Sequence, residues 1–551
     1  MELTVATPLA QAELGGTAGC CLASRLSEDP NISVLLLERG PLSDDWQAHV
    51  PLLSSNFYHP GAPAAIFPLS PLAHVDQRRL HAVWKNMGRE TWGYDVLEPY
   101  FVKSERTLSQ PPSSFRGNDG VWLNQTFPTP FLEMARRIPK AVTSLGIPQS
   151  PDLNSPVAPV VCSATVDIAM DRNMHRHSTL QAFLPPKVAH ARKKNLKICV
   201  NTIVTQIKFA TDDNPGMQHP KAVGVYFEDT RSKRTSARFF ARASREVILC
   251  AGAIGSPQIL MLSGVGPRDH LSRHSLGLVR DLPGVGSYLR DHVGIPVSYE
   301  VPIHESLNIL RNSIFQVLSE VVKYLLFGSG LLSVPFVQTT IFLRSLLLNE
   351  NLEIVAAPGD LNARNPDNIP DIEVMPFGYR GGEAKTSPLD RVGVFSLLAA
   401  LVKPKSFGSV RLASTDPHAR AQVDLGYFSD PEDILVARKA VRFALRLGEQ
   451  VRAQGYPLKD LVVPDSETDD QSLGVFMRKS LLTTYHYTST CRMAPEDGPQ
   501  SGVVDDDLKV HGIDGLRICD CSVFPDILST HPMAGAVVVA EKCADLIKKS
   551  P

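Results

Sequence analysis

Two histidines near the C-terminal end of the chain have side chains that can move a proton. They are His486 and His531, and Pro532 directly follows the second of them. Proline is typical of the first turn of a helix, and Ser529 or Thr530 can act as a cap, so we expect a helix to begin at His531. A helix N-terminus stabilises negative charge, and an imidazole takes up a proton near neutral pH. The pair therefore predicts chemistry in which a hydroxyl loses its proton and gains alkoxide character.

A cluster of glycines near the N-terminus is the second feature that could do chemistry. Gly15, Gly16 and Gly19 have the spacing of a turn whose backbone approaches a pyrophosphate. Leu14 stands where such a turn has its first glycine, and a side chain there makes the tight turn harder to form. The cluster is therefore a degenerate form of a phosphate-binding motif.

The elements that follow the glycines fit a nucleotide-binding unit. Apolar residues recur with helical spacing over residues 17–28, and residues 32–37 form a short β-rich run that ends at Glu38. Glu38 follows Gly19 by nineteen residues. In a dinucleotide-binding βαβ unit, an acid at this distance accepts hydrogen bonds from the ribose hydroxyls. Turn, helix, strand and acid together predict a dinucleotide site.

The middle of the chain is predicted to contain β-structure. Residues 195–209 and 221–228 alternate apolar and polar side chains around a turn-rich stretch, residues 212–216, and indicate a hairpin. A further strand is expected over residues 238–249. Mixed α and β elements without internal repeats indicate an α/β protein with an added antiparallel sheet.

Two further regions have helical character. Residues 132–145 are predicted to form a helix with a kink or break at Pro139. The most apolar region, residues 313–343, is interrupted by Glu320 and Lys323, whereas a membrane span needs about 20 consecutive apolar residues. We expect this region to form a buried helix and loop, or an apolar wall beside a substrate, and not a membrane span.

The composition narrows the class of protein. The chain has 551 residues with 56 Lys and Arg against 57 Asp and Glu, so its charge indicates no nucleic-acid partner. Its nine cysteines contain no C-x-x-C pair, which argues against a metal site and favours buried, reduced thiols. No basic residue precedes Arg25 and no apolar leader is present, so we expect no secretory signal and a cytoplasmic location.

Longer motifs connect these pieces to a known family. Residues 252–266 read GAIGSPQILMLSGVG, and further matching stretches occur at residues 283–292, 403–414 and 504–547. In this order they resemble the glucose-methanol-choline (GMC) family of flavin-dependent oxidoreductases, including its members from fungal secondary metabolism. The resemblance covers most of the chain.

The resemblance implies a fold and a cofactor. The expected fold is α/β (α+β), with a discontinuous, Rossmann-like FAD-binding domain and an antiparallel-sheet substrate-binding domain. The implied FAD-binding domain has three parts, residues 1–130, 195–293 and 483–551. Residues 131–194 would form a lid or substrate-side segment, and residues 294–482 the substrate-binding domain.

The resemblance also implies roles for single residues. His486 would remove the hydroxyl proton of the substrate while hydride passes to flavin N5, and His531 would be its partner. The residues expected to bind FAD are Gly15, Gly16, Thr17, Ala18, Gly19, Glu38, Val204, Asp520, Cys521 and Met533. The substrate would be a small-molecule alcohol, of aryl or polyketide type, and the electron acceptor oxygen or a quinone-like carrier. No metal is implied.

The chain departs from the family pattern in three places. Residues 3–6 are the one strand-like fragment ahead of the glycines, so the usual N-terminal strand is expected to be missing, and either this fragment substitutes for it or the edge of the flavin site is incomplete. The first signature of the family is absent, because residues 80–87 read LHAVWKNM where a Gly-Gly-Ser-Ser loop is usual. Ser489 stands where the family has glycine.

These departures leave other interpretations open. One is a flavin-deficient relative that serves as a binding protein, or the product of a faulty gene model. Another is a lyase or isomerase that keeps FAD in a structural role. Within the matching stretches, Asp291 and His292 are interpreted as a structural pair at a turn, and Tyr485 and Tyr487 as core residues or a substrate wall.

Overall fold

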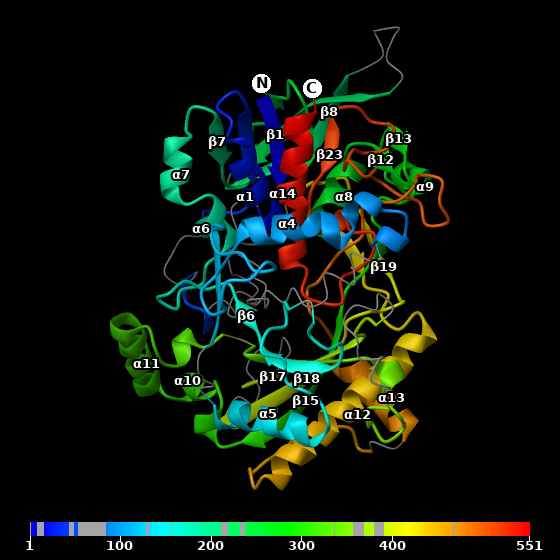
Figure 1. Cartoon of the computed structure of the whole chain (residues 1–551). Coiled ribbons are helices and arrows are strands. Elements are labelled where there is room, and N and C mark those ends of the chain that lie inside the picture. The colour runs from blue at the N-terminus through cyan, green and yellow to red at the C-terminus, as the bar shows by residue number, and fades with distance from the viewer. Residues whose placement is uncertain are drawn as a thin grey trace.

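The computed structural model of the chain has two halves (Figure 1). One is built on a parallel sheet and carries both termini (the parallel-sheet half), and the other is built on an antiparallel sheet (the antiparallel-sheet half). The described residues are 2–7, 16–42, 49–52, 84–127, 132–155, 157–210, 219–231, 237–335, 337–355, 368–378, 391–466 and 469–550.

The parallel sheet has the strand order β23-β11-β1-β2-β7 among the described residues. Its strands are β1 (Glu2–Thr7), β2 (Ser33–Glu38), β7 (Leu196–Cys199), β11 (Val247–Leu249) and β23 (Leu516–Ile518). β1 lies between β2 and β11, with Thr4 opposite Leu35 on one side and Val247 on the other. The fragment at residues 3–6 therefore takes the place of the N-terminal strand, and the expectation that this strand is missing was wrong.

Helix α1 (Gly16–Leu26) connects β1 to β2 and packs beside helix α14 (Met533–Lys549). Nε of Arg25 on α1 donates a hydrogen bond of 2.8 Å to Oε1 of the buried Glu541 on α14. The helix predicted over residues 17–28 and the strand predicted up to Glu38 are confirmed. The first and last helices of the chain thus cover the same sheet.

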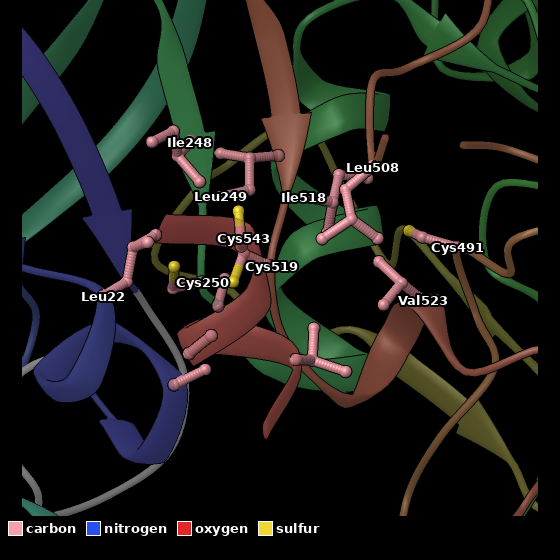
Figure 2. Close-up of a cluster of buried hydrophobic side chains, with 14 of the residues drawn as sticks. Leu22, Ile248, Leu249, Cys250, Cys491, Leu508, Ile518, Cys519, Val523 and Cys543 are labelled. Atoms are coloured by element: carbon pink, nitrogen blue, oxygen red, sulfur yellow. The ribbon is translucent and has the colours of Figure 1, made fainter. Parts of the chain in front are cut away.

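The core of the parallel-sheet half consists of apolar side chains between the sheet and these helices. Figure 2 shows Leu22 of α1 beside Leu249 of β11 and Ile518 of β23, with thiols gathered between them. All nine cysteines are free, and all but Cys199 and Cys521 are buried. The expectation of buried, reduced thiols is confirmed for those seven.

The predicted strands of the middle region are divided between two sheets. β8 (Thr202–Ala210) and β9 (Lys221–Asp229) form the expected antiparallel hairpin, and β10 (Phe239–Arg242) extends it. The prediction was wrong in joining residues 195–209 into one strand, because Asn201 adopts φ 52° and separates β7 from β8. Residues 238–249 likewise divide into β10 and β11.

The antiparallel sheet has the strand order β21-β15-β18-β17-β16-β5 among the described residues, with β22 also paired to β15. Its strands are β5 (Cys162–Thr165), β15 (Val293–Val301), β16 (Thr339–Leu343), β17 (Ile372–Phe377), β18 (Gly393–Leu401), β21 (Lys459–Val462) and β22 (Leu482–Thr483). One face packs on α5 (Glu133–Ser144), α12 (Pro431–Ala453) and α13 (Asp470–Ser480). A mixed α/β fold with separate parallel and antiparallel sheets confirms the predicted fold class.

Of the two helix predictions, one is confirmed and one needs correction. The helix predicted over residues 132–145 is α5, which continues through Pro139 without a break and packs against the antiparallel-sheet core with Met134 and Val142. α11 (Ile314–Phe327) forms within the apolar region but is not buried. Its apolar side chains that are more than half exposed are Ile314, Phe315, Leu318, Val322, Leu325, Leu326 and Phe327. Apolar character in the sequence predicted the helix but could not show whether another element covers it. Among the described residues, no helix combines the length and apolar character needed to cross a bilayer.

Shorter elements complete the two halves. The strands are β3 (Glu105–Thr107), β4 (Trp122–Thr126), β6 (Asp167–Ile168), β12 (Val265–Gly266), β13 (Arg280–Asp281), β14 (Ser287–Leu289), β19 (Gly408–Arg411) and β20 (Gln422–Asp424). The helices are α4 (Tyr94–Ser104), α6 (Thr179–Phe183), α7 (Pro186–Ala191), α8 (Gly252–Leu262), α9 (Arg268–Arg273) and α10 (Ile309–Asn312), with 3-10 turns η2 (Glu90–Trp92), η3 (Ile303–Glu305), η4 (Leu331–Ser333), η5 (Ser345–Leu347) and η7 (Cys521–Val523).

Candidate active site

His486 lies on a bulged segment between two paired strands. β22 pairs with β15 at Thr483 and Val293, and pairing resumes at Thr488 and Arg290. Four residues on one side therefore face two on the other, and the longer side bulges. His486 is 5 % exposed and belongs to this bulge.

Asp291 holds the bulge in place from the shorter side. Its Oδ1 accepts the backbone N–H of His486 at 2.7 Å, and its Oδ2 accepts the hydroxyl of Thr483 at 2.5 Å and that of Tyr427. Burial raises the pKa of Asp291 to about 7, although these donors favour its ionised form. The carboxyl group thus fixes the backbone from which the His486 ring projects.

The ring of His486 contacts two other imidazoles. Nδ1 of His486 lies 2.9 Å from Nδ1 of His292, and Nε2 of His292 lies 2.8 Å from the carbonyl oxygen of Leu528. On the other side, the ring centroids of His486 and His531 are 4.6 Å apart. Burial, with contributions from its two histidine neighbours, holds the pKa of His486 well below 6.5. His486 is therefore neutral at pH 7 and able to accept a proton.

His292 was interpreted from the sequence as half of a structural pair at a turn, and the structure brings it into the site. It directly precedes β15, and the pairing of Val293 with Thr483 places it beside the start of the bulge. The signal available in the sequence was its place in the matching stretch at residues 283–292. Pairing between segments this far apart in the chain could not be deduced from it.

Glu373 is a second site residue that sequence reasoning missed. Its Oε1 lies 3.3 Å from Nε2 of His531 and accepts the hydroxyl of Thr340 at 2.6 Å. Burial alone would raise the pKa of Glu373, but its polar neighbours, led by His531, outweigh burial and lower the pKa. An ionised carboxylate is only an acceptor, so Nε2 of His531 carries the hydrogen in this contact.

Three buried polar atoms around His531 have no hydrogen-bond partner among the described residues. They are Nδ1 of His531, Oε2 of Glu373 and Oγ of Ser529. Buried polar atoms are nearly always paired in folded proteins, and unpaired ones indicate a ligand or ordered water. The three atoms therefore indicate a place for a polar ligand group or ordered water beside His531.

The helix that follows His531 begins later than predicted. α14 starts at Met533, and Pro532 is its N-cap residue with φ −78° and ψ −8°. The expectation that the helix starts at His531 was wrong, and Ser529 does not cap it, because its Oγ has no hydrogen-bond partner among the described residues. The first N–H groups of α14 follow His531 closely in the chain, and a helix N-terminus can stabilise negative charge.

The predicted phosphate-binding residues lie at the start of α1. Gly16 opens the helix with φ +56°, and a Cβ added there would meet a single heavy atom within 4 Å, the carbonyl oxygen of Cys250 at 3.9 Å. Thr17 is partly buried, and Ala18 and Gly19 are buried in the core contact of the helix. Gly15 lies outside the described residues.

Glu38 and Val204 lie near one another at the other side of the parallel sheet. Glu38 ends β2, is buried, and accepts the N–H of Gly40 at 2.5 Å. The carbonyl of Gly40 accepts the N–H of Asn201 at 2.9 Å, which brings the start of β8 beside the end of β2. Val204 lies in β8 next to a β-bulge.

Asp520 and Cys521 follow β23 and contact the start of α8. Oδ2 of Asp520 accepts the hydroxyl of Ser256 at 2.6 Å and the N–H of Gly252 at 2.9 Å. The carbonyl oxygen of Cys521 accepts the N–H of Ser489 at 3.1 Å. The Asp520 side chain therefore anchors the GAIGSP stretch to the end of β23.

The departure at residues 80–87 falls partly outside the described residues. Within the described remainder, Trp84 is fully buried and donates from Nε1 to the carbonyl oxygen of Asp526 at 3.2 Å. Its ring lies 5.1 Å from that of Phe524. The end of this stretch thus packs against the segment that leads to His531.

Ligands of open parallel sheets bind at the carboxyl ends of the strands. Gly16, Glu38 and Asp520 all lie at or just beyond those ends, while the three imidazoles lie where the antiparallel sheet meets α14. A helix that starts with glycine at these strand ends, together with a cluster of buried imidazoles, is an arrangement typical of dinucleotide-dependent oxidoreductases.

Comparisons with known proteins agree that the chain is an oxidoreductase. Two profiles described as GMC oxidoreductase match residues 77–294 and 404–540. The dehydrogenase str4 of Strobilurus tenacellus is 30% identical over 97% of this chain and 93% of that protein. The chain belongs to the GMC oxidoreductase family.

Two solved structures show the same fold. A variant of the formate oxidase of Aspergillus oryzae RIB40 superposes with a TM-score of 0.81 at 24% identity, covering 99% of this chain and 97% of that chain. A fungal aryl-alcohol oxidase superposes with a TM-score of 0.75 at 22% identity, covering 99% and 98%.

Members of this family bind FAD, and FAD is the cofactor of this chain. The residues present fit such a group. Polar atoms without a partner among the described residues lie at and beside His531, α14 starts two residues after it, and a Cβ added at Gly16 would meet a single heavy atom within 4 Å.

Proposed function

We propose that this protein oxidises a primary or secondary alcohol, with His486 as the base. Bound FAD supplies the redox chemistry by accepting hydride from the alcohol carbon at N5. The observation that carries the proposal is the pair of buried imidazoles, His486 and His531, with ring centroids 4.6 Å apart at the segment that leads into α14.

The neutral His486 ring is suited to take the hydroxyl proton. Burial keeps its pKa well below 6.5, so the ring needs no prior loss of a proton at pH 7. His531 is held from one side by Glu373, and its Nδ1, which has no partner among the described residues, is available to a polar group of the substrate. In this arrangement His531 orients the alcohol and His486 removes its proton.

The cofactor would be held at the carboxyl ends of the parallel strands. The start of α1 would meet the pyrophosphate, Glu38 the ribose and Val204 the adenine side, while Met533 and the Asp520 segment would lie near the flavin ring. The residues proposed to contact FAD are Gly15, Gly16, Thr17, Ala18, Gly19, Glu38, Val204, Asp520, Cys521 and Met533.

The proposed domain division follows the two sheets. Residues 1–130, 195–293 and 483–551 would form the FAD-binding domain, and residues 294–482 the substrate-binding domain. β5, within residues 131–194, pairs with β16 of the antiparallel sheet, which supports a substrate-side role for that segment.

We propose an aryl or other apolar biosynthetic alcohol as the substrate class. The fungal aryl-alcohol oxidase with the same fold supports an aryl substrate, and the fungal dehydrogenase relative supports a biosynthetic setting. The electron acceptor would be oxygen or a quinone-like carrier.

To test the proposal, the purified holoprotein is mixed anaerobically with each of a panel of aryl alcohols, and the absorption of the flavin is measured over time. Loss of the oxidised flavin band is expected with the wild type. His486→Ala should slow it by about 10²- to 10⁴-fold while FAD stays bound. His304→Ala, in the exposed turn η3, is the matched control and should leave the rate unchanged.

The alternatives give different results in the same experiment. A folded protein that takes up no FAD would identify a flavin-deficient relative. Substrate turnover without flavin bleaching would identify a lyase or isomerase. Bleaching at an unchanged rate in His486→Ala would show that another group is the base.

A further inference from the structure

We infer that His292 is a positioning residue that decides which ring nitrogen of His486 carries the hydrogen. The inference rests on the proposed function, because it specifies which nitrogen of the proposed base receives the substrate proton. It follows from a chain of three contacts that runs from a backbone carbonyl to the far side of the His486 ring.

The first contact fixes the tautomer of His292. Its Nε2 lies 2.8 Å from the carbonyl oxygen of Leu528, and a carbonyl oxygen only accepts. Nε2 of His292 therefore carries a hydrogen. Burial lowers the pKa of His292 to about 3, so the ring holds a single hydrogen at neutral pH. Its Nδ1 is then a lone-pair acceptor.

The second contact determines the tautomer of His486. The Nδ1 atoms of the two rings are 2.9 Å apart, and the ring planes cross at 89°. Two lone pairs facing one another at this distance would repel, so one nitrogen must donate. Because His292 can only accept here, Nδ1 of His486 carries the hydrogen. The neutral His486 ring then has its lone pair on Nε2.

The third contact supports the same assignment independently. The hydroxyl of Thr484 donates to the carbonyl oxygen of His292 at 3.2 Å, so its oxygen faces other groups as an acceptor. Nδ1 of His486 lies 3.1 Å from that oxygen. A hydrogen on this nitrogen satisfies both neighbours, whereas a lone pair would satisfy neither.

These contacts leave only Nε2 of the His486 ring available to the substrate. Nδ1 of His486 is engaged by His292 and Thr484, while the backbone N–H of His486 is held by Asp291 at 2.7 Å. When Nε2 takes up a proton, Nδ1 continues to donate to His292, and the charged ring keeps its partner. Asp291 and His292, adjacent in the sequence, thus position the backbone and the ring of the same base.

The test reads the tautomer directly. The holoprotein is labelled with ¹⁵N-histidine, and the ring signals of His486 are identified by their loss in His486→Gln. In the wild type at pH 7 we expect a pyrrole-type shift for Nδ1 and a pyridine-type shift for Nε2. A wild-type His486 with the hydrogen on Nε2 would overturn the inference.

Substitution at His292 provides the second readout. His292→Leu removes the acceptor, so the Nε2–H form of His486 should gain population and kcat should fall about 10- to 100-fold with little change in KM. His292→Gln carries both an acceptor and a donor and should restore part of both effects. Unchanged His486 shifts and kcat in His292→Leu would contradict the inference.

A buried histidine elsewhere is the matched control. His270 on α9 is buried, and its Nε2 accepts the N–H of Leu412 at 3.0 Å. His270→Leu should change neither the His486 shifts nor kcat. Failure of the proposed function is distinguishable, because a protein that oxidises no alcohol still reports its His486 tautomer.

Discussion

Oε1 of Glu373 lies 3.3 Å from Nε2 of His531, and this contact joins strand β17 to the segment that begins α14. Ile372 and Val374, on either side of Glu373, point to the opposite face and pack in the core formed with α12. Because successive side chains of a strand point to opposite faces of the sheet, Glu373 points toward the histidines. A register shift of one residue would instead bury its side chain against a helix.

Glu373→Gln is expected to lower kcat about 10- to 100-fold, because the amide keeps the shape of the side chain but removes the negative charge that holds His531. Steady-state kinetics with the substrate found in the alcohol panel is the measurement. Glu300→Gln on strand β15 of the same sheet, where the carboxylate makes a surface ion pair with Lys459, is the control and should have wild-type kcat. Equal kcat in both variants would rule out a role for the Glu373 charge.

Ser489→Gly should raise the free energy of unfolding by about 1 kcal/mol. Ser489 is buried and has φ +70°, a left-handed conformation that costs a residue with a Cβ about that much and costs glycine little. Urea denaturation of the holoprotein measures the change. Ser489→Ala retains the Cβ and should show no such gain, so stabilisation in both variants would point to the hydroxyl instead.

Glu38→Gln should weaken FAD binding about tenfold, because a ribose hydroxyl loses a charged acceptor while Gly40 keeps an oxygen to donate to. Equilibrium dialysis with FAD fluorescence gives the dissociation constant. Glu28→Gln, whose carboxylate pairs with Arg25 and Lys548 near the surface, serves as the comparison. An unchanged dissociation constant for FAD in Glu38→Gln would show that Glu38 does not bind the ribose.

The protein should lose stability as the pH falls from 6.5 toward 3. Burial lowers the pKa of His292 to about 3, whereas an unfolded histidine has about 6.5. Between these values the unfolded chain binds the proton and the folded chain does not. The free energy of unfolding therefore decreases as the pH falls, by about 1.4 kcal/mol for each pH unit. Urea midpoints from pH 7 to 5 should therefore fall less steeply in His292→Leu than in the wild type. Parallel curves would show that His292 is not held neutral.

Local patterns in the sequence were enough for the nucleotide-binding unit. The helical spacing behind Gly16, the β-rich run ending at Glu38 and the matching stretches predicted α1, β2, the fold class and the family. These features depend on neighbours within one element, where side-chain periodicity directly reflects backbone geometry. The two histidines could be selected for the same reason, from their own local context.

Other features depended on partners far away in the chain. The sequence did not show that residues 195–209 divide between two sheets, that α11 is exposed, or that the fragment at residues 3–6 completes the parallel sheet. In each case the deciding factor is which other element pairs with or covers the segment. Periodicity within a segment carries no information about that partner.

By itself, therefore, the sequence determined which chemistry the chain can attempt, through its glycine turn, its acid and His486 with His531. Only the tertiary structure decided how the base is held. The pairing of β22 with β15 places His292 against His486, and the register of β17 places Glu373 against His531. The physical reason is that hydrogen bonds of a few ångströms between imidazoles and carboxylates require strand pairings between distant segments, and these form only when the whole sheet assembles.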